Sequence, residues 1–127
     1  MSASTWHALH YPLRPGSEEK VKELFRNSGR PTFDVLDGGG VPVGRLLGTM
    51  AFVGKRLAVR VIEVEGDLPA VAAHMSRQPV VREFERQLEE HLLVPRDMTT
   101  PDGARRFFQQ AAMECVLVRR HDLELHP

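Results

Sequence analysis

The stretch RLLGTMAFVGKRLAVRVIEVE at residues 45–65 decides the fold. Two runs rich in β-forming residues, 45–53 and 56–65, flank Gly54 and Lys55. A glycine at the first central position suits a two-residue type II′ turn, so the stretch predicts an antiparallel hairpin. This turn would pair Phe52 with Leu57, Met50 with Val59 and Gly48 with Val61 on one face, and Ala51 with Ala58, Thr49 with Arg60 and Leu47 with Ile62 on the other.

The remaining elements follow from helix caps, prolines and apolar periodicity. Reading these signals together gives strands at residues 5–13 and 115–118 and helices that start at Ser17, Asp67, Pro79 and Thr100, the first of them ending near Asn27. Residues 31–44 carry four glycines and two prolines and are expected to form a long loop. A loop of this kind is either a lid or binding segment or a disordered connector.

This order of elements, β-α-β-β-α-(α-α)-β, matches the ferredoxin-like split βαβ arrangement of the α+β class. At 127 residues the chain is expected to form one domain over residues 1–127, with a single core. Helices in this arrangement cover one side of an antiparallel sheet, and polar residues are expected on the other side. The hairpin instead is mostly apolar on both faces.

An apolar sheet face left in water would expose several hundred Å², and at roughly 25 cal/mol per Å² its burial is worth many kcal/mol. The sequence therefore predicts a homodimer packed sheet to sheet, a dimeric α/β-barrel. The bulky face with Met50, Phe52 and Leu57 is expected under the helices. The face with Ala51 and Ala58 would then point toward the partner and leave an apolar hollow suited to a small molecule.

Several polar or aromatic residues are expected to reach this hollow. Thr49 and Arg60 lie on its predicted face, although Arg60 could instead extend to the rim or pair with a carboxylate of the partner. On the first strand, Leu9, Tyr11 and Leu13 are expected to face the helices, which turns Trp6, Ala8 and His10 into the hollow.

Histidines are the candidate proton-transfer groups. In an apolar pocket His10 is a candidate general base or acid near neutral pH, and His74 on the second helix is a weaker candidate; either is otherwise structural. The histidines do not cluster at the spacings of metal ligands, so no metal site is expected. The single cysteine, Cys115, is expected to be a small core residue.

Composition excludes several classes of function. The chain has 17 basic and 17 acidic residues, so it lacks the positive excess of a nucleic-acid-binding protein. Residues 1–7 lack the features of a signal peptide, and no apolar run is long enough to span a membrane, so a cytoplasmic protein with no membrane partner is expected. The glycines at 38–40 do not form a nucleotide-binding motif, and no cofactor is expected.

Seven short segments together resemble the SchA/CurD-like domain family, over about residues 7–112. They are GRP at 29–31, RLLGT at 45–49, VIEVEGD at 61–67, HM at 74–75, QP at 78–79, PRD at 95–97 and PDGARRFF at 101–108. Residues 37–44 and 121–127 fall outside the pattern. The resemblance implies a dimeric α/β-barrel and a role in bacterial aromatic polyketide biosynthesis, of the spore-pigment and antibiotic type, beside a polyketide synthase. It carries over no catalytic residues.

Three functions are compatible with these features. The leading hypothesis is an enzyme that cyclises and aromatises a polyketide intermediate by aldol chemistry, with His10 as base, Arg60 stabilising the enolate, and Thr49, Trp6, Ala51 and Ala58 around the substrate. The second is a cofactor-free monooxygenase that converts an anthrone-like phenol into a quinone. The third is a non-catalytic dimer that assists the synthase complex.

Overall fold

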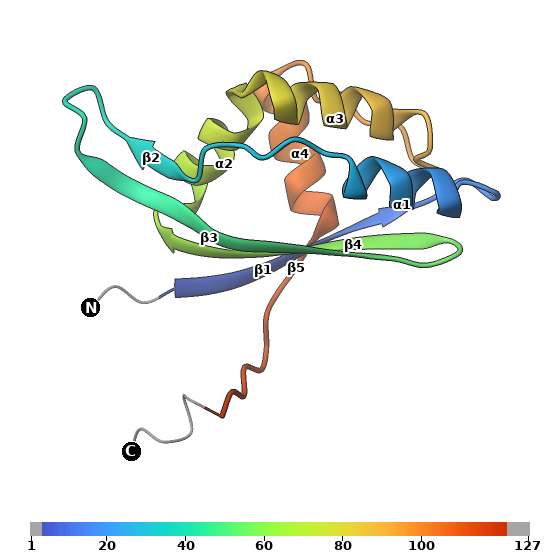
Figure 1. The fold of residues 1–127 in the computed structure, drawn as a ribbon, viewed down its shortest axis with the longest axis horizontal. Coiled ribbons are helices and arrows are strands. Elements are labelled where there is room, and N and C mark those ends of the chain that lie inside the picture. The colour runs from blue at the N-terminus through green and yellow to red at the C-terminus, as the bar shows by residue number, and fades with distance from the viewer. Residues whose placement is uncertain (1–3, 122–127) are drawn as a thin grey trace.

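The computed structural model describes residues 4–121, in which four helices lie on one side of a five-stranded antiparallel sheet (Figure 1). The elements are β1 (Ser4–Pro12), α1 (Glu18–Arg26), β2 (Asp34–Leu36), β3 (Pro42–Val53), β4 (Leu57–Gly66), α2 (Leu68–Arg77), α3 (Pro79–Glu89), α4 (Pro101–Ala111) and β5 (Ala112–Met113). The strand order is β2-β3-β4-β1-β5. Without β2 this is the ferredoxin-like order, so the predicted fold class is confirmed. None of the helices within residues 4–121 has the length and apolarity needed to cross a bilayer.

The helix starts follow the predicted caps, with one exception. The Asp67 carboxylate accepts a hydrogen bond from the Ala70 N–H at 3.3 Å, and the Thr100 hydroxyl accepts one from the Gly103 N–H at 3.0 Å. Ser17 precedes α1 as predicted, but its side chain makes no capping bond. Its hydroxyl is buried and lies 3.2 Å from Nδ1 of His91, so it ties α1 to the end of α3 instead.

The predicted hairpin forms between β3 and β4, but its register is displaced by two residues. Phe52 lies opposite Val59 instead of Leu57, and Ala51 lies opposite Arg60 instead of Ala58. The reason is that the turn lies one residue further along the chain: the bond of 2.7 Å from the Gly54 N–H to the Leu57 carbonyl encloses Lys55 and Arg56, instead of the predicted Gly54 and Lys55. Since side chains alternate with a period of two, this displacement keeps residues 48–53 grouped into the two predicted faces. A bulge between Leu46 and Gly48 interrupts the alternation, so the predicted pair of Leu47 with Ile62 is wrong and Leu46 is buried opposite Val64 instead.

The prediction of which face packs under the helices is wrong. Ala58 is buried beside Tyr11 and Leu88, whereas Phe52 is 58% exposed on the opposite face. The physical reason is complementarity of size: the helices contribute the large side chains Leu88 and Phe84, and small sheet residues leave room for them. The expectation for β1 is confirmed, because Leu9, Tyr11 and Leu13 are buried on the helix side.

Residues 31–44 do not form a continuous loop. Residues 34–36 form β2, which pairs with the start of β3, and residues 37–41 make the turn between them. The Asp37 carboxylate accepts hydrogen bonds from the N–H groups of Gly39 and Val41, at 2.8 and 3.0 Å. The polar side chain at the turn therefore organises the glycine-rich segment as a hairpin.

The last strand also differs from the prediction. β5 consists of Ala112–Met113, which pair with Leu9 and Ala8 of β1. Residues 115–118 have no regular structure and are exposed, so Cys115 is not a core residue. The chain leaves the sheet at this point and continues below it, away from the helices (Figure 1).

Gly66 is required where β4 turns into α2. Its φ is +90°, and a Cβ added there would lie 2.7 Å from both the Gly44 Cα and the Val43 carbonyl oxygen. Left-handed strain and this backbone clash together should make Gly66→Ala cost about 2 to 4 kcal/mol of unfolding free energy. Urea titration measures this cost, with Gly38→Ala as the control because a Cβ at Gly38 meets nothing within 4 Å. Equal stabilities of the two variants would contradict the prediction.

Candidate functional site

The sheet separates the predicted site residues into two groups. Directly opposed residues of an antiparallel pair share one face. His10 lies opposite Val59 on the side away from the helices, which we call the open face, and Trp6 shares that side. Arg60 lies opposite Leu9 and Ala51 on the helix side. The predicted single pocket containing both His10 and Arg60 is therefore wrong.

The remaining predicted residues also lie on the helix side of the sheet or on α2. Ala58 is a core residue, Thr49 is exposed beside Ile62, and Ala51 is exposed at the edge of the sheet. His74 lies on α2 and its Nε2 is 3.1 Å from the Thr32 hydroxyl. His74 thus holds the segment that leads into β2, and it makes no described contact with Arg60 or His10 within residues 4–121.

The open face is bulky and mostly apolar, with two carboxylates at the end where β1 begins. Its apolar, aromatic and histidine side chains are Trp6, Ala8, His10, Met50, Phe52, Leu57, Val59, Val61 and Met113, and its polar ones include Ser4, Glu63 and Glu65. Among these, Met50, Phe52, Leu57 and Met113 are strongly exposed. Large side chains of this kind fill an interface and leave little room for a hollow, so the predicted chamber on the outward face loses its basis.

His10 has a defined tautomer. Its Nδ1 lies 2.8 Å from the Ala111 carbonyl oxygen. Because that oxygen only accepts hydrogen bonds, Nδ1 carries the proton, and in the neutral ring Nε2 has the free lone pair. His10 therefore has one basic nitrogen, at the edge of the sheet where α4 ends.

Three charged residues and one tyrosine form a buried group on the helix side of the sheet. We call this group, Tyr11, Arg60, Glu85 and Arg96, the arginine cluster. Glu85 lies between the two guanidinium groups, with its Oε1 3.6 Å from Nη1 of Arg60 and its Oε2 bound to Nη2 of Arg96. The side chains of Arg96, Glu85 and Arg60 are 4%, 13% and 21% exposed. Buried charges of this kind persist only when paired, so the cluster is a specific polar site in an otherwise apolar layer.

Aromatic rings surround both guanidinium groups. Arg60 lies 5.4 Å from the Phe25 ring centre and 5.1 Å from that of Phe84. Arg96 lies 4.4 Å from the Phe107 ring centre and 5.8 Å from that of Tyr11. These distances are those of cation–π contacts, which hold a planar cation against a flat apolar surface.

Burial raises the pKa of the Tyr11 hydroxyl and is the largest of the influences on that pKa. Arg60 opposes this rise, Glu85 adds to it, and Arg96 opposes it. The result is a phenol that stays protonated at neutral pH. Tyr11 is therefore a hydrogen-bond donor within electrostatic reach of both arginines.

The raised pKa of Tyr11 predicts a loss of stability in alkali. The stability that this group contributes is complete below the unfolded tyrosine pKa of about 10 and is lost as the pH rises through the higher folded value. Tyr11→Phe should weaken this alkaline dependence, measured by urea unfolding on either side of that pH. Tyr11 is the single tyrosine of the chain, so the tyrosinate absorbance reports it directly. Ionisation at the ordinary pKa in the folded protein would contradict the prediction.

A groove of ≈580 Å³ lies between α1 and the hairpin, near the arginine cluster. Phe25, Ala51 and Val53 line it, and Phe52 and Val59 extend it round the edge of the sheet to the open face. Lys22 and Arg26 add positive charge. Phe25 is the link to the cluster, because its ring also contacts Arg60.

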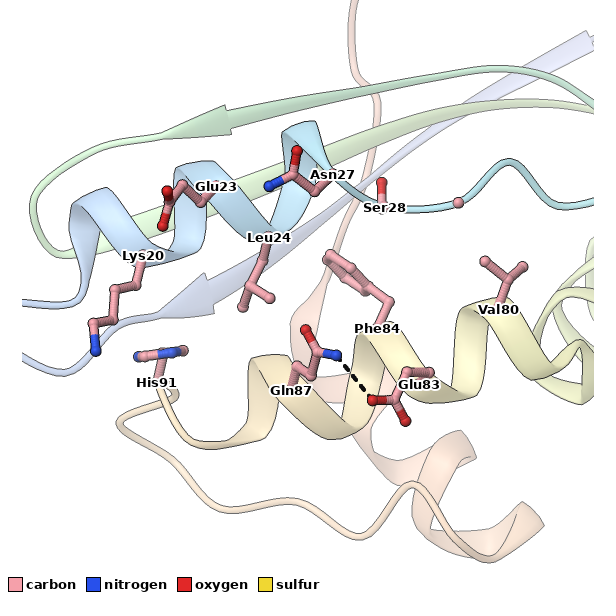
Figure 2. A pocket seen from close by; sticks show the side chains of 11 residues that line it. Lys20, Glu23, Leu24, Asn27, Ser28, Val80, Glu83, Phe84, Gln87 and His91 are labelled. Carbon is pink, nitrogen blue, oxygen red and sulfur yellow. Dashed lines mark hydrogen bonds between the residues drawn. The ribbon is translucent and has the colours of Figure 1, made fainter.

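A second groove, of ≈540 Å³, lies between α1 and α3 (Figure 2). Its carboxylate Glu83 is already engaged by Gln87 at 2.8 Å and by Arg86 at 2.6 Å. The hydrogen bond from Arg86 is the main cause that lowers the pKa of Glu83 to about 2. Glu23, Lys20 and His91 also line this groove, but none of the predicted site residues does.

Sequence reasoning missed the roles of Tyr11, Glu85 and Arg96. Tyr11 was expected only as a helix-facing side chain, and Glu85 lies in a helix with many charged residues. Arg96 lies in the PRD segment between α3 and α4, and nothing local in the sequence shows that it turns inward. No group of three potential metal ligands lies close enough to hold an ion in the part of the chain that the structure describes.

The fold and site define a class of protein: a ferredoxin-like α+β protein with helices on one side of the sheet, an apolar open face, and a buried arginine cluster beside a groove. Within this class, the family model described as "SchA/CurD like domain" matches residues 4–120. The chain belongs to this family, as its sequence segments indicated.

Three curated relatives come from Streptomyces. Polyketide synthase CurD of Streptomyces cyaneus is 44% identical over 112 residues, covering 88% of this chain and 29% of the relative. The 42.8 kDa protein in the whiE locus of Streptomyces coelicolor is 41% identical over 110 residues, which cover 87% of this chain and 26% of the relative. Protein SchA of Streptomyces halstedii is 38% identical over 110 residues, which cover 87% of this chain and 28% of the relative. The chain thus spans less than a third of the length of these relatives. No solved structure gives a significant match.

Proposed function

We propose that this protein acts in aromatic polyketide biosynthesis, as a homodimer that binds a polyketide intermediate and promotes its cyclisation and aromatisation. The similarity to polyketide synthase CurD supports the pathway. The observation that carries the activity is the position of Arg60, whose guanidinium lies over the adjoining rings of Phe25 and Phe84, while Phe25 also lines the groove.

The open face supports the homodimer. Its exposed side chains Met50, Phe52 and Leu57 form a continuous apolar surface with Val59 and Val61 of the same sheet. A second copy presents an identical apolar surface, and a twofold contact buries both. The groove also depends on this contact, because Phe52 and Val59 line it from the open face. A partner seated on that face would close the outer wall of the groove.

The chemistry follows from the groove and the arginine. The enolised parts of a folded poly-ketone chain are flat and can lie against the apolar surface of Phe25 and Ala51, while its carbonyl oxygens require polar partners such as Arg60. The acidic methylene between two ketones loses its proton to solvent, and a preorganised guanidinium stabilises the negative oxygen of the resulting enolate. The enolate carbon then bonds to a second carbonyl carbon, whose oxygen takes up a proton and leaves as water during aromatisation. The methylene groups between ketones are reactive, so holding the chain in one folded pose supplies much of the rate. In this proposal Arg60 binds the enolate oxygen, and His10 and Trp6 belong to the dimer interface.

The test is product formation from a reconstituted synthase that releases an uncyclised polyketide. Adding the purified protein should shift the products toward a single aromatic ring pattern, followed by liquid chromatography and mass spectrometry. Oxygen uptake with an anthrone substrate would instead identify the oxidation reaction. An unchanged product profile with no oxygen uptake would leave a non-catalytic accessory dimer.

Replacing His10 shows on which side of the sheet the ligand binds. If the ligand lies on the helix side, His10→Asn should keep the rate within about twofold, whereas removing a true general base costs about 10²- to 10⁴-fold. The asparagine amide reproduces the position of Nδ1 and keeps an N–H donor for the Ala111 carbonyl. The measurement is the rate of the same reconstituted reaction. A hundredfold loss would move the reaction to the open face and overturn the assignment to Arg60.

A further inference from the structure

Two of the three side-chain nitrogens of Arg96 are hydrogen-bonded to carboxylates, and the third has no partner among the described residues. Its Nε donates to Glu89 at 2.8 Å, its backbone N–H donates to the same carboxylate at 3.1 Å, and its Nη2 binds Glu85. Nη1 is buried and has no hydrogen-bond partner among the described residues. Buried donors are almost always paired, so an unpaired one in a charged side chain that is only 4% exposed marks a position for an acceptor.

The surroundings of Nη1 favour a negative oxygen. In the buried part of the cluster two guanidinium groups share the one carboxylate of Glu85, whereas Glu89 is 35% exposed and partly solvated. The two guanidinium groups thus have two carboxylate partners, of which only Glu85 is well inside the cluster. The Tyr11 hydroxyl, which burial keeps protonated, adds a further donor. A negative oxygen accepts stronger hydrogen bonds from a guanidinium than a neutral one does, and it would use both kinds of donor.

The geometry also selects the class of ligand. A carboxylate or phosphate prefers to bind arginine through two parallel hydrogen bonds, but Nε and Nη2 of Arg96 are already engaged. A single nitrogen remains, which suits an acceptor with one oxygen. The rings of Tyr11 and Phe107 are stacked with centroids 5.5 Å apart, and both contact the guanidinium, so the surroundings are flat and aromatic. Phenolates and enolates of flat aromatic molecules meet both conditions.

We propose that Nη1 of Arg96 is an oxyanion-binding donor that holds a phenolate or enolate oxygen of an aromatic ligand, with Tyr11 as a second donor. In this proposal the ligand enters at the groove lined by Phe25, and the side chains between that groove and Arg96 move to admit it, because the described lining of the groove does not include Arg96. This inference rests on the proposed function for the identity of the natural ligand. It adds a second oxygen site, deeper than Arg60, which would hold another oxygen of the same chain.

The test uses 4-nitrophenol, a small flat phenol whose ionised form absorbs visible light. Binding at Nη1 should stabilise the phenolate, so the bound probe should show roughly a tenfold higher ratio of phenolate to phenol than the free probe at the same pH, equivalent to one pKa unit. Arg96→Met should abolish this increase. Tyr11→Phe should reduce it while keeping binding. Arg86→Met is the matched control, because Arg86 is an exposed arginine on α3 whose carboxylate partner is Glu83.

A second variant protects the test against misfolding. Arg96→Lys keeps the positive charge for Glu85 and Glu89 but has no second terminal nitrogen, so a folded Arg96→Lys protein should also lose the increase. Circular dichroism and urea unfolding establish that each variant is folded. The proposal is overturned if the wild-type protein leaves the probe's ionisation unchanged, or if folded Arg96→Lys shifts it as the wild type does.

The assay measures binding and ionisation without turnover. A normal shift of the probe together with no effect on polyketide products would contradict the proposed function and leave the oxyanion site intact. No shift of the probe together with the expected change in polyketide products would support the proposed function and show that Arg96 takes no part in it.

Discussion

Replacing Arg60 by methionine is expected to lower the rate of polyketide cyclisation by about 10²- to 10³-fold, the usual cost of removing one preorganised oxyanion donor. Methionine keeps much of the length and the apolar contact with Phe25 and Phe84, so the groove should keep its shape. Glu85 retains Arg96 as its partner, and the fold should survive. The measurement is the initial rate of aromatic product formation in the reconstituted synthase reaction.

The matched control is Arg45→Met. Arg45 is also a sheet arginine with carboxylate partners, Asp34 at 3.2 Å and Glu65 at 3.9 Å. It lies near the start of β3, whereas Arg60 on β4 pairs with Ala51 near the end of β3. Its loss should leave the rate unchanged. Equal rates for Arg60→Met and the wild type, with both proteins folded, would remove Arg60 from the chemistry. A similar loss in Arg45→Met would indicate a general effect of arginine on the sheet.

The second large effect is expected at the open face. Phe52→Asp places a carboxylate on both sides of a twofold interface, where it would be buried without a partner. Large interface side chains commonly contribute 2 to 4 kcal/mol, so the dissociation constant should rise by about 30-fold to 10³-fold. Sedimentation velocity across a concentration series measures the change.

Leu93→Asp is the control for Phe52→Asp. Leu93 is 57% exposed, close to the 58% of Phe52, but it follows α3 and lies outside the sheet. The two substitutions therefore add the same charge at equally exposed apolar positions. Dissociation by Phe52→Asp alone would assign the contact to the open face. An equal effect of both variants would point to general solubility and contradict the assignment.

Local signals predicted the elements of this fold well. Asp67 and Thr100 accept the hydrogen bonds expected of helix caps, and Pro79 begins α3. Alternation along β1 correctly placed Tyr11 toward the helices. These features depend on a few neighbouring residues, and such short-range interactions are visible in the sequence.

Long-range choices were less visible. The turn encloses Lys55 and Arg56 instead of Gly54 and Lys55, and this moved the partners of residues 48–53 by two positions. Alternation divides a strand into two faces, but it does not show which face the helices cover. That choice depends on how Ala58 fits Leu88 and on the carboxylate that Glu85 supplies to Arg60, both of which are tertiary contacts.

The candidate site was found only in part for the same reason. Ala51 lines the groove, and Arg60 lies over Phe25, which also lines it. Both residues are on the other side of the sheet from His10, with which the sequence grouped them. Arg96 enters the cluster from a segment 36 positions later, and its partners Glu85 and Glu89 come from α3. No spacing rule connects residues that meet only after the helices pack.

The central claim is that a second copy of the chain covers the open face. The most direct measurement is the molar mass of the purified protein by sedimentation equilibrium at micromolar concentration. The chain has a mass of 14.3 kDa, so a dimer predicts twice that value, 28.6 kDa. A mass of 14.3 kDa under these conditions would contradict the account, because the groove would lack its outer wall and the apolar face would remain in water.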